Sequence, residues 1–79
     1  MELKYNKENR RYGVVKFGCW KHEGLHCGQG LKVLINEKWL ESRLEMDWST
    51  GEGVWYLVGT GLKGNELCRL EVVLIKGEE

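Results

Sequence analysis

Residues 31–48 read LKVLINEKWLESRLEMDW, and this stretch decides the fold. From residue 38 onward apolar and charged side chains alternate, which is the period of a strand with one buried and one wet face. The buried face is predicted to hold Leu40, Ser42, Leu44, Met46 and Trp48. Asn36 accepts positive φ, so a tight turn at Asn36-Glu37 would join this strand to residues 31–35 as a hairpin. The alternative is a helix over 38–48, because Leu, Glu, Arg and Met also favour helices.

Outward from this hairpin the chain reads as short apolar runs divided by polar or glycine-containing turns. Strands are predicted at 3–5, 12–17, 31–35, 38–48, 54–59 and 67–75, and residues 1–10 form an N-terminal strand and turn. Residues 19–30 are rich in Cys, His and Gly and are predicted to be a loop, and 77–79 a tail. Five or six strands without a long crossover predict one all-β domain over residues 1–79, a small antiparallel barrel or rolled sheet of the SH3-like kind.

The length and cysteine content restrict the compartment. A chain of 79 residues supports one small core, so domains of this size often add a metal, disulfides or a partner. The three cysteines are an odd count, and no secretory signal precedes them, which argues against a disulfide framework. No segment approaches the roughly 20 apolar residues of a membrane span. We therefore expect a cytoplasmic protein of a bacterial host, with no membrane association.

Charge is balanced overall but uneven along the chain. Twelve basic and twelve acidic residues cancel, which disfavours both a dedicated nucleic-acid binder and a mimic of DNA. Residues 1–22 hold six basic and two acidic residues, and the remaining 57 hold six and ten, so the two parts carry +4 and −4. This pattern suits docking onto a charged protein, with nucleic-acid binding weak or absent.

Four potential zinc ligands lie within nine residues in the 19–30 segment: Cys19, His22, His26 and Cys27. Thiolate and imidazole are the ligands that zinc prefers, and four of them complete a closed structural site. The crowding is atypical, because most structural zinc sites join two separate segments, and Cys68 is a reserve ligand. The alternatives are a buried Cys27 beside a His26 that satisfies a backbone carbonyl, or a free reactive thiol.

Exposed aromatic and basic side chains are the candidates for partner binding. Trp39 falls on the charged face of its strand and Trp20 sits in the cysteine-containing segment, so both are candidate anchors. Together with nearby charges they form the predicted partner-binding set: Trp20, Trp39, Arg10, Arg11 and Lys21. Paired carboxylates and a phosphate-binding glycine loop are lacking, and a Cys-His pair alone lacks an orienting group, so we expect no enzymatic activity.

Three ordered blocks carry a resemblance: Leu25-His26-Cys27-Gly28, residues 33–39 and residues 55–59. Over about residues 11–75 the chain resembles a family of small uncharacterised β domains encoded by Firmicutes, their phages and mobile elements. In that family a glycine commonly ends the hairpin turn, whereas Glu37 stands here, which leaves the turn type open. Cys19 and His22 lie outside the family pattern, so a complete zinc site would be peculiar to this chain.

A mobile-element origin implies a class of function. The chain is similar in size and style to anti-CRISPR proteins that act on type II RNA-guided nucleases. The resemblance thus implies a non-enzymatic inhibitor that binds the effector nuclease and blocks target DNA loading or activation. The alternatives are a nucleic-acid-binding accessory domain that uses the basic N-terminal third, and a structural subunit of a phage or mobile-element assembly.

Overall fold

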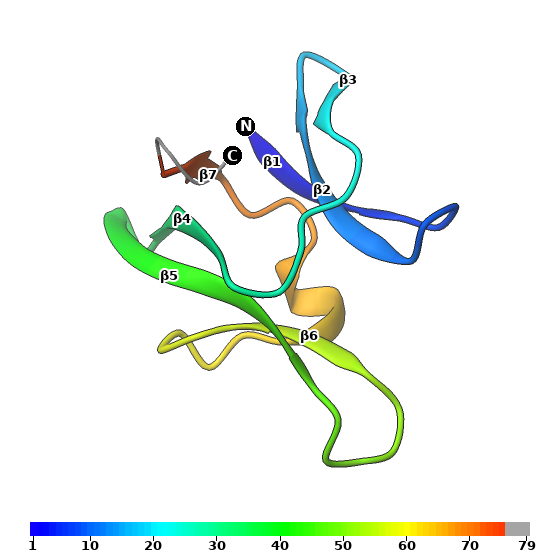
Figure 1. Ribbon diagram of the computed structural model, residues 1–79. Helices are drawn as coiled ribbons and strands as arrows, with labels where there is room; N and C mark the ends of the chain where they lie inside the picture. Colours follow the sequence, from blue (N-terminus) through cyan, green and yellow to red (C-terminus); the bar gives the residue numbers. More distant parts are fainter. Residues whose placement is uncertain (76–79) are drawn as a thin grey trace.

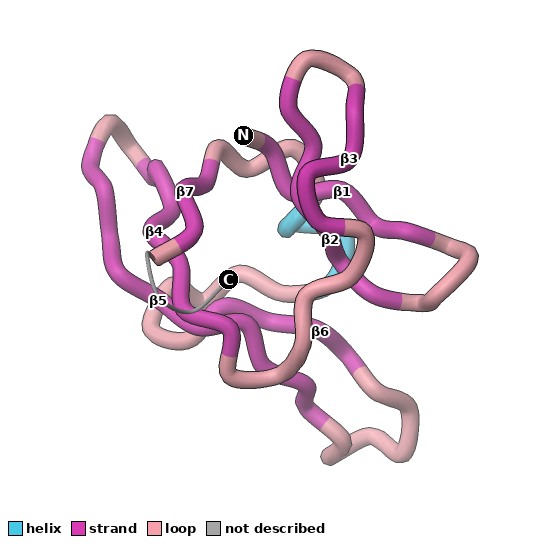
Figure 2. Tube along the Cα trace, turned by 45° about the horizontal axis from the view of Figure 1, so that its top comes forward, coloured by secondary structure: helices cyan, strands magenta, loops and turns pink. Residues whose placement is uncertain are grey.

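The chain folds into two antiparallel sheets (Figures 1 and 2). The computed structural model describes residues 1–75. These residues form seven strands and one turn of 3-10 helix: β1 (Glu2–Asn6), β2 (Arg11–Lys16), β3 (Cys19–His22), β4 (Gln29–Ile35), β5 (Lys38–Asp47), β6 (Val54–Leu57), η1 (Gly64–Leu67) and β7 (Val72–Leu74). One sheet has the order β1-β2-β3 and the other β6-β5-β4-β7. The predicted all-β domain is therefore confirmed, with seven strands in place of five or six.

The β4–β5 hairpin confirms the pattern in residues 31–48. Its register runs from Gln29 opposite Leu44 to Ile35 opposite Lys38. Asn36 and Glu37 have φ of 51° and 66°, so both central residues of the turn lie in the left-handed region that a type I′ turn requires. The turn forms although Glu37 stands where glycine would fit without strain. The helix alternative for 38–48 is wrong.

Backbone hydrogen bonds join the two sheets where the chain returns to its N-terminal strand. The Leu3 amide donates to the Leu70 carbonyl at 3.0 Å, and the Arg69 amide donates to the Leu3 carbonyl at 2.8 Å. An isolated bridge pairs Glu2 with Glu71 just before β7. Neither sheet closes into a barrel, so the barrel alternative of the predicted fold is wrong.

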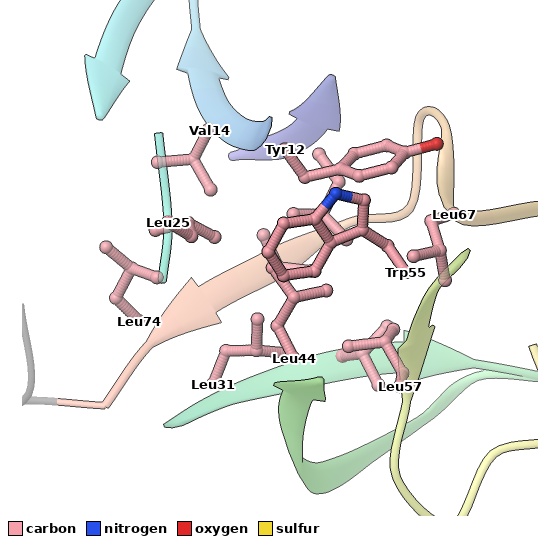
Figure 3. Close-up of a cluster of buried hydrophobic side chains, with 12 residues drawn as sticks. Tyr12, Val14, Leu25, Leu31, Leu44, Trp55, Leu57, Leu67 and Leu74 are labelled. Carbon is pink, nitrogen blue, oxygen red and sulfur yellow. The ribbon is translucent and has the colours of Figure 1, made fainter. Parts of the chain in front are cut away.

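The core fills the space between the sheets and draws on β1, β2 and β4 to β7, on η1 and on the segment after β3. Twelve buried apolar side chains form one cluster, nine of which Figure 3 labels: Leu3, Tyr12, Val14, Leu25, Leu31, Val33, Leu44, Trp55, Leu57, Leu67, Val72 and Leu74. In β5, Leu44 is fully buried and Leu40 is 39 % exposed, and Trp48, just after the strand, is 67 % exposed. The prediction that Leu40 and Trp48 lie in the core is wrong.

Two predicted boundaries are also wrong. Residues 19–30 contain β3, which pairs with β2, because Phe17 and Gly18 take φ of 53° and 77° and close a two-residue turn. The predicted last strand over 67–75 begins only at Val72, since η1 and a following turn occupy the earlier positions. The predicted tail, 77–79, lies outside the described residues. Among residues 1–75 no helix has the length and apolarity needed to cross a bilayer.

Candidate binding groove

A hollow of about 710 Å³ lies between the β1–β2 turn and the β5–β6 turn. In Figures 1 and 2 both turns project on the same side of the molecule. Aromatic side chains from four separate segments line the hollow: Tyr5, Tyr12, Trp48 and Trp55, with Met46 beside them. We call this hollow the groove. Because four aromatic rings and several polar and charged residues meet there between two hairpins, the groove has the composition of a recognition site.

The floor of the groove is fixed by hydrogen bonds. Tyr12 Oη donates to the Gly64 carbonyl at 2.9 Å, and Trp55 Nε1 donates to the Arg10 carbonyl at 3.4 Å. Both rings are buried, so their polar atoms need these partners. The Tyr5 ring packs edge-on against Tyr12 with centroids 5.4 Å apart. These contacts hold the floor in place without a ligand.

Trp48 forms the most exposed wall of the groove. A Cβ added at Gly53 would lie 3.1 Å from the Trp48 ring and 2.6 Å from Met46 Sδ, so the indole rests directly on the glycine backbone. The opposite side of the indole faces solvent, and Trp48 is 67 % exposed. The alternation pattern predicts Trp48 in the core. The sequence signal against this prediction is the turn at 49–53, because β5 ends at Asp47, before Trp48.

The rim of the groove is positively charged. Arg10 and Arg11 lie beside it, against one lining carboxylate, Glu52. Arg11 Nη1 donates to the Leu25 carbonyl at 3.2 Å, which orients that guanidinium. Arg10 has φ of 57°, and its carbonyl accepts the Trp55 bond. Two of the five predicted partner-binding residues therefore meet at this site.

The other three predicted partner-binding residues lie elsewhere. Trp20 and Lys21 belong to β3, and Trp39 follows the β4–β5 turn, where it is 48 % exposed. The structure therefore distributes the predicted set over three surfaces, and Tyr5 and Trp48 are groove residues that the sequence did not indicate.

The predicted zinc ligands do not converge. Cys19 and His22 stand at opposite ends of β3, and three residues along a strand turn a side chain to the other face. His26 Nδ1 lies 3.0 Å from the Cys27 carbonyl oxygen. Within residues 1–75 no three His, Cys, Asp or Glu side chains form a group that could hold a metal ion. Cys19, Cys27 and Cys68 are all exposed, so the alternative of a buried Cys27 is wrong.

Comparison with known protein families identifies the family to which the chain belongs. The family described as "Domain of unknown function (DUF5348)" matches residues 1–73. The chain belongs to the DUF5348 family. This match confirms the predicted membership of an uncharacterised family and extends it to the N-terminus. No curated protein and no solved structure matches the chain.

Among residues 1–75 of this DUF5348 domain, two side chains have a clearly shifted pKa, and both shifts have structural causes. Burial raises the pKa of Tyr12 well above its usual value, and the neighbouring Cys68, whose sulfur lies 3.6 Å from Tyr12 Oη, raises it further. The Ser49 amide donates to Asp47 Oδ1 at 2.8 Å and lowers the pKa of that exposed carboxyl. The first group holds the groove floor and the second caps the 48–51 turn, so neither needs a catalytic role.

Zinc binding by the DUF5348 domain stays a prediction, and it would require residues 19–27 to turn so that both cysteines face one point. We expect about one equivalent of zinc in protein expressed with ample metal, measured by elemental analysis. Chelation, or Cys19→Ser with Cys27→Ser, should then lower the melting temperature sharply, because bound metal stabilises the folded state. Substoichiometric zinc together with unchanged melting after chelation would contradict the prediction.

Proposed function

We propose that this domain is a non-enzymatic binding module that takes a segment of a partner protein into the groove. The observation that carries the proposal is Trp48, a large aromatic side chain that packs on the backbone of Gly53 yet is 67 % exposed. Tryptophan is among the residues that dominate protein interfaces, because one ring buries a large area at small entropic cost.

The charge at the groove indicates the chemistry of the partner segment. Arg10 and Arg11 stand at the rim with one opposing lining carboxylate, Glu52. A segment that places an apolar or aromatic side chain between Tyr5 and Trp48, with Asp or Glu beside it, would match both features. Guanidinium groups bind carboxylates through two parallel hydrogen bonds, which also fixes the direction of the segment.

The geometry of the groove supports a site that binds a partner and catalyses no reaction. A nucleophilic site needs a base within hydrogen-bond reach and a third group that orients the base. Tyr12, the most perturbed titratable group at the groove, is a buried donor to the Gly64 carbonyl and contributes to the floor. The groove thus has aromatic surface and fixed charge, which are the requirements of recognition.

In its most specific form the proposal names the partner as a type II RNA-guided nuclease, which the domain would hinder in target DNA loading or activation. This form rests on the resemblance in size and context drawn from the sequence. The family description assigns no function and adds no support. Addition of the domain should then lower target cleavage by the purified nuclease while leaving nuclease and guide covalently intact, and Trp48→Ala should restore cleavage.

A display library of random peptides, selected on the immobilised domain, tests the general proposal. We expect selected peptides to carry an aromatic or large apolar residue next to Asp or Glu. Trp48→Ala should weaken their binding by at least about 30-fold, since an interface anchor contributes about 2 kcal/mol and each 1.4 kcal/mol is tenfold.

Trp39→Ala is the matched control, because it removes an exposed tryptophan from the far end of β5. We expect it to leave peptide affinity unchanged. Both variants should melt as the parent does, since neither side chain belongs to the core cluster. Equal losses in the two variants, or peptides without an acidic preference, would contradict the proposal.

A further inference from the structure

The two sheets divide the charge of the chain between them. Residues 1–22, which hold all of β1, β2 and β3, carry six basic and two acidic residues, a net +4 within a chain of zero net charge. The sheet β6-β5-β4-β7 lies within the acidic remainder. The expectation of weak nucleic-acid binding came from the net charge of the whole chain, which averages two surfaces of opposite sign.

One exposed aromatic side chain stands at the end of the basic sheet. Phe17 is 93 % exposed in the β2–β3 turn, where its φ is 53°. A phenylalanine at positive φ is strained, and its exposed ring adds no core packing. The Lys16 ammonium lies 5.5 Å from the ring centroid. Neither folding nor the groove explains this placement.

Trp20 lies beside Gly13 on the same sheet. A Cβ at Gly13 would meet the His22 carbonyl oxygen and would lie 2.8 Å from the indole, so β3 and its indole approach β2 closely where glycine leaves room. Lys4, the partner of Gly13 in β1, places its ammonium 5.7 Å from the centroid of that ring. Trp20 remains 36 % exposed. Lys4 of β1 and Trp20 of β3 therefore lie close together across Gly13 of β2.

A second hollow, of about 610 Å³, is lined by Phe17 and by Lys4, whose ammonium also lies near Trp20. Phe17 and Val15 line it on one side, and three cationic residues, Lys4, Lys7 and Arg69, line it against one carboxylate, Glu2. Lys4 thus belongs both to this hollow and to the contact with Trp20. We call the surface formed by Lys4, Lys7, Phe17, Trp20 and Arg69 the outer face.

We propose that the outer face binds single-stranded nucleic acid. Unpaired bases stack on Phe17 and Trp20, and the cations of the hollow contact the phosphates that connect these bases. Aromatic rings interleaved with fixed positive charge are the arrangement by which proteins hold single strands without sequence preference. A duplex keeps its bases stacked on one another and offers no free base face. The five residues of the outer face do not line the groove, although Tyr5 and Asn65 line both hollows, so the two proposals are tested with different variants.

Fluorescence anisotropy with labelled oligothymidine, oligouridine and a DNA duplex tests this inference. We expect both single strands to bind more tightly than the duplex, with an affinity that falls steeply as salt rises. Phe17→Ala should weaken binding by about 5- to 150-fold, since stacking is worth about 1–3 kcal/mol per base and 1.4 kcal/mol is tenfold. Lys7→Gln should weaken all single strands alike and reduce the salt slope by about one.

The matched controls distinguish base stacking on Phe17 from nonspecific attraction to the protein surface. Phe17→Tyr keeps an aromatic ring and should retain binding, and Trp39→Ala removes an exposed tryptophan of the other sheet and should have no effect. Trp20→Ala should also weaken binding, and its melting curve shows whether the sheet persists. Preference for the duplex, equal effects of Phe17→Ala and Trp39→Ala, or equal competition by poly-glutamate, which would indicate an acidic protein partner, would overturn the inference. Peptide binding at the groove is measured separately, so either proposal can fail alone.

Discussion

Replacing Leu44 with alanine should remove much of the folding stability of this domain. Leu44 is fully buried in β5 and pairs with Gln29 of β4 on one side and with Leu57 of β6 on the other. Truncating a buried leucine costs about 2–5 kcal/mol, because it removes transfer energy and leaves a cavity. Small domains have only about 5–15 kcal/mol in total. The melting temperature should therefore fall by at least about 10 °C, measured by circular dichroism.

Leu40→Ala is the matched control, because Leu40 lies four residues earlier on the same face of β5. It is 39 % exposed, so we expect a cost below about 1 kcal/mol. Urea titration of both variants compares them at constant temperature. Equal losses would mean that the core extends along the whole of β5, contrary to the burial described above.

The same pair shows how far alternation predicts burial. The period of two correctly placed Ser42 and Leu44 on the inward face, because strand geometry alone decides which side chains share a face. It failed for Trp48 because β5 ends at Asp47, and for Leu40 because burial also depends on the neighbouring strands. β6 pairs with β5 only between Leu44 and Asp47, so the first half of β5 has neighbours on one edge only. The sequence of β5 alone does not show where β6 pairs with it.

The β2–β3 turn was unpredictable for a different reason. Hairpin turns with both central residues at positive φ usually carry Asn, Asp or Gly, and here Phe17 takes the first position. The glycines that follow gave residues 19–30 the composition of a loop. The composition of residues 19–30 therefore did not predict β3, which is the strand that carries Trp20. An unfavourable local conformation at an exposed residue is a feature expected where function selects the residue.

The groove could be predicted only in part, because its residues are distant in sequence. Local charge indicated Arg10 and Arg11, and both lie at the rim. Tyr5, Tyr12 and Trp55 join them only after the two sheets pack around one core. Sequence spacing relates residues within one segment, and it does not show surfaces that are assembled from several strands.

Alkaline pH should destabilise the domain through Tyr12. Burial, assisted by Cys68, raises the pKa of Tyr12 in the folded state above the unfolded value near 10. Below about pH 10 the phenol is protonated in both states, and stability does not depend on it. Above that pH the unfolded chain loses the proton first. The free energy of unfolding should then fall by about 1.4 kcal/mol per pH unit until the folded state also ionises.

Tyr12→Phe isolates this contribution, because it removes the ionising hydroxyl and keeps the ring. At neutral pH the variant should lose about 1 kcal/mol, since the Gly64 carbonyl no longer receives a hydrogen bond from Tyr12 Oη. Between pH 10 and 12 its stability should fall less steeply than that of the parent. Tyr5→Phe, which removes a neighbouring and more exposed hydroxyl, should retain the steep decline. Parallel alkaline curves for the parent and Tyr12→Phe in urea titrations would show that Tyr12 ionises with equal ease in the folded and unfolded states, and that the buried hydroxyl does not hold the groove floor as described.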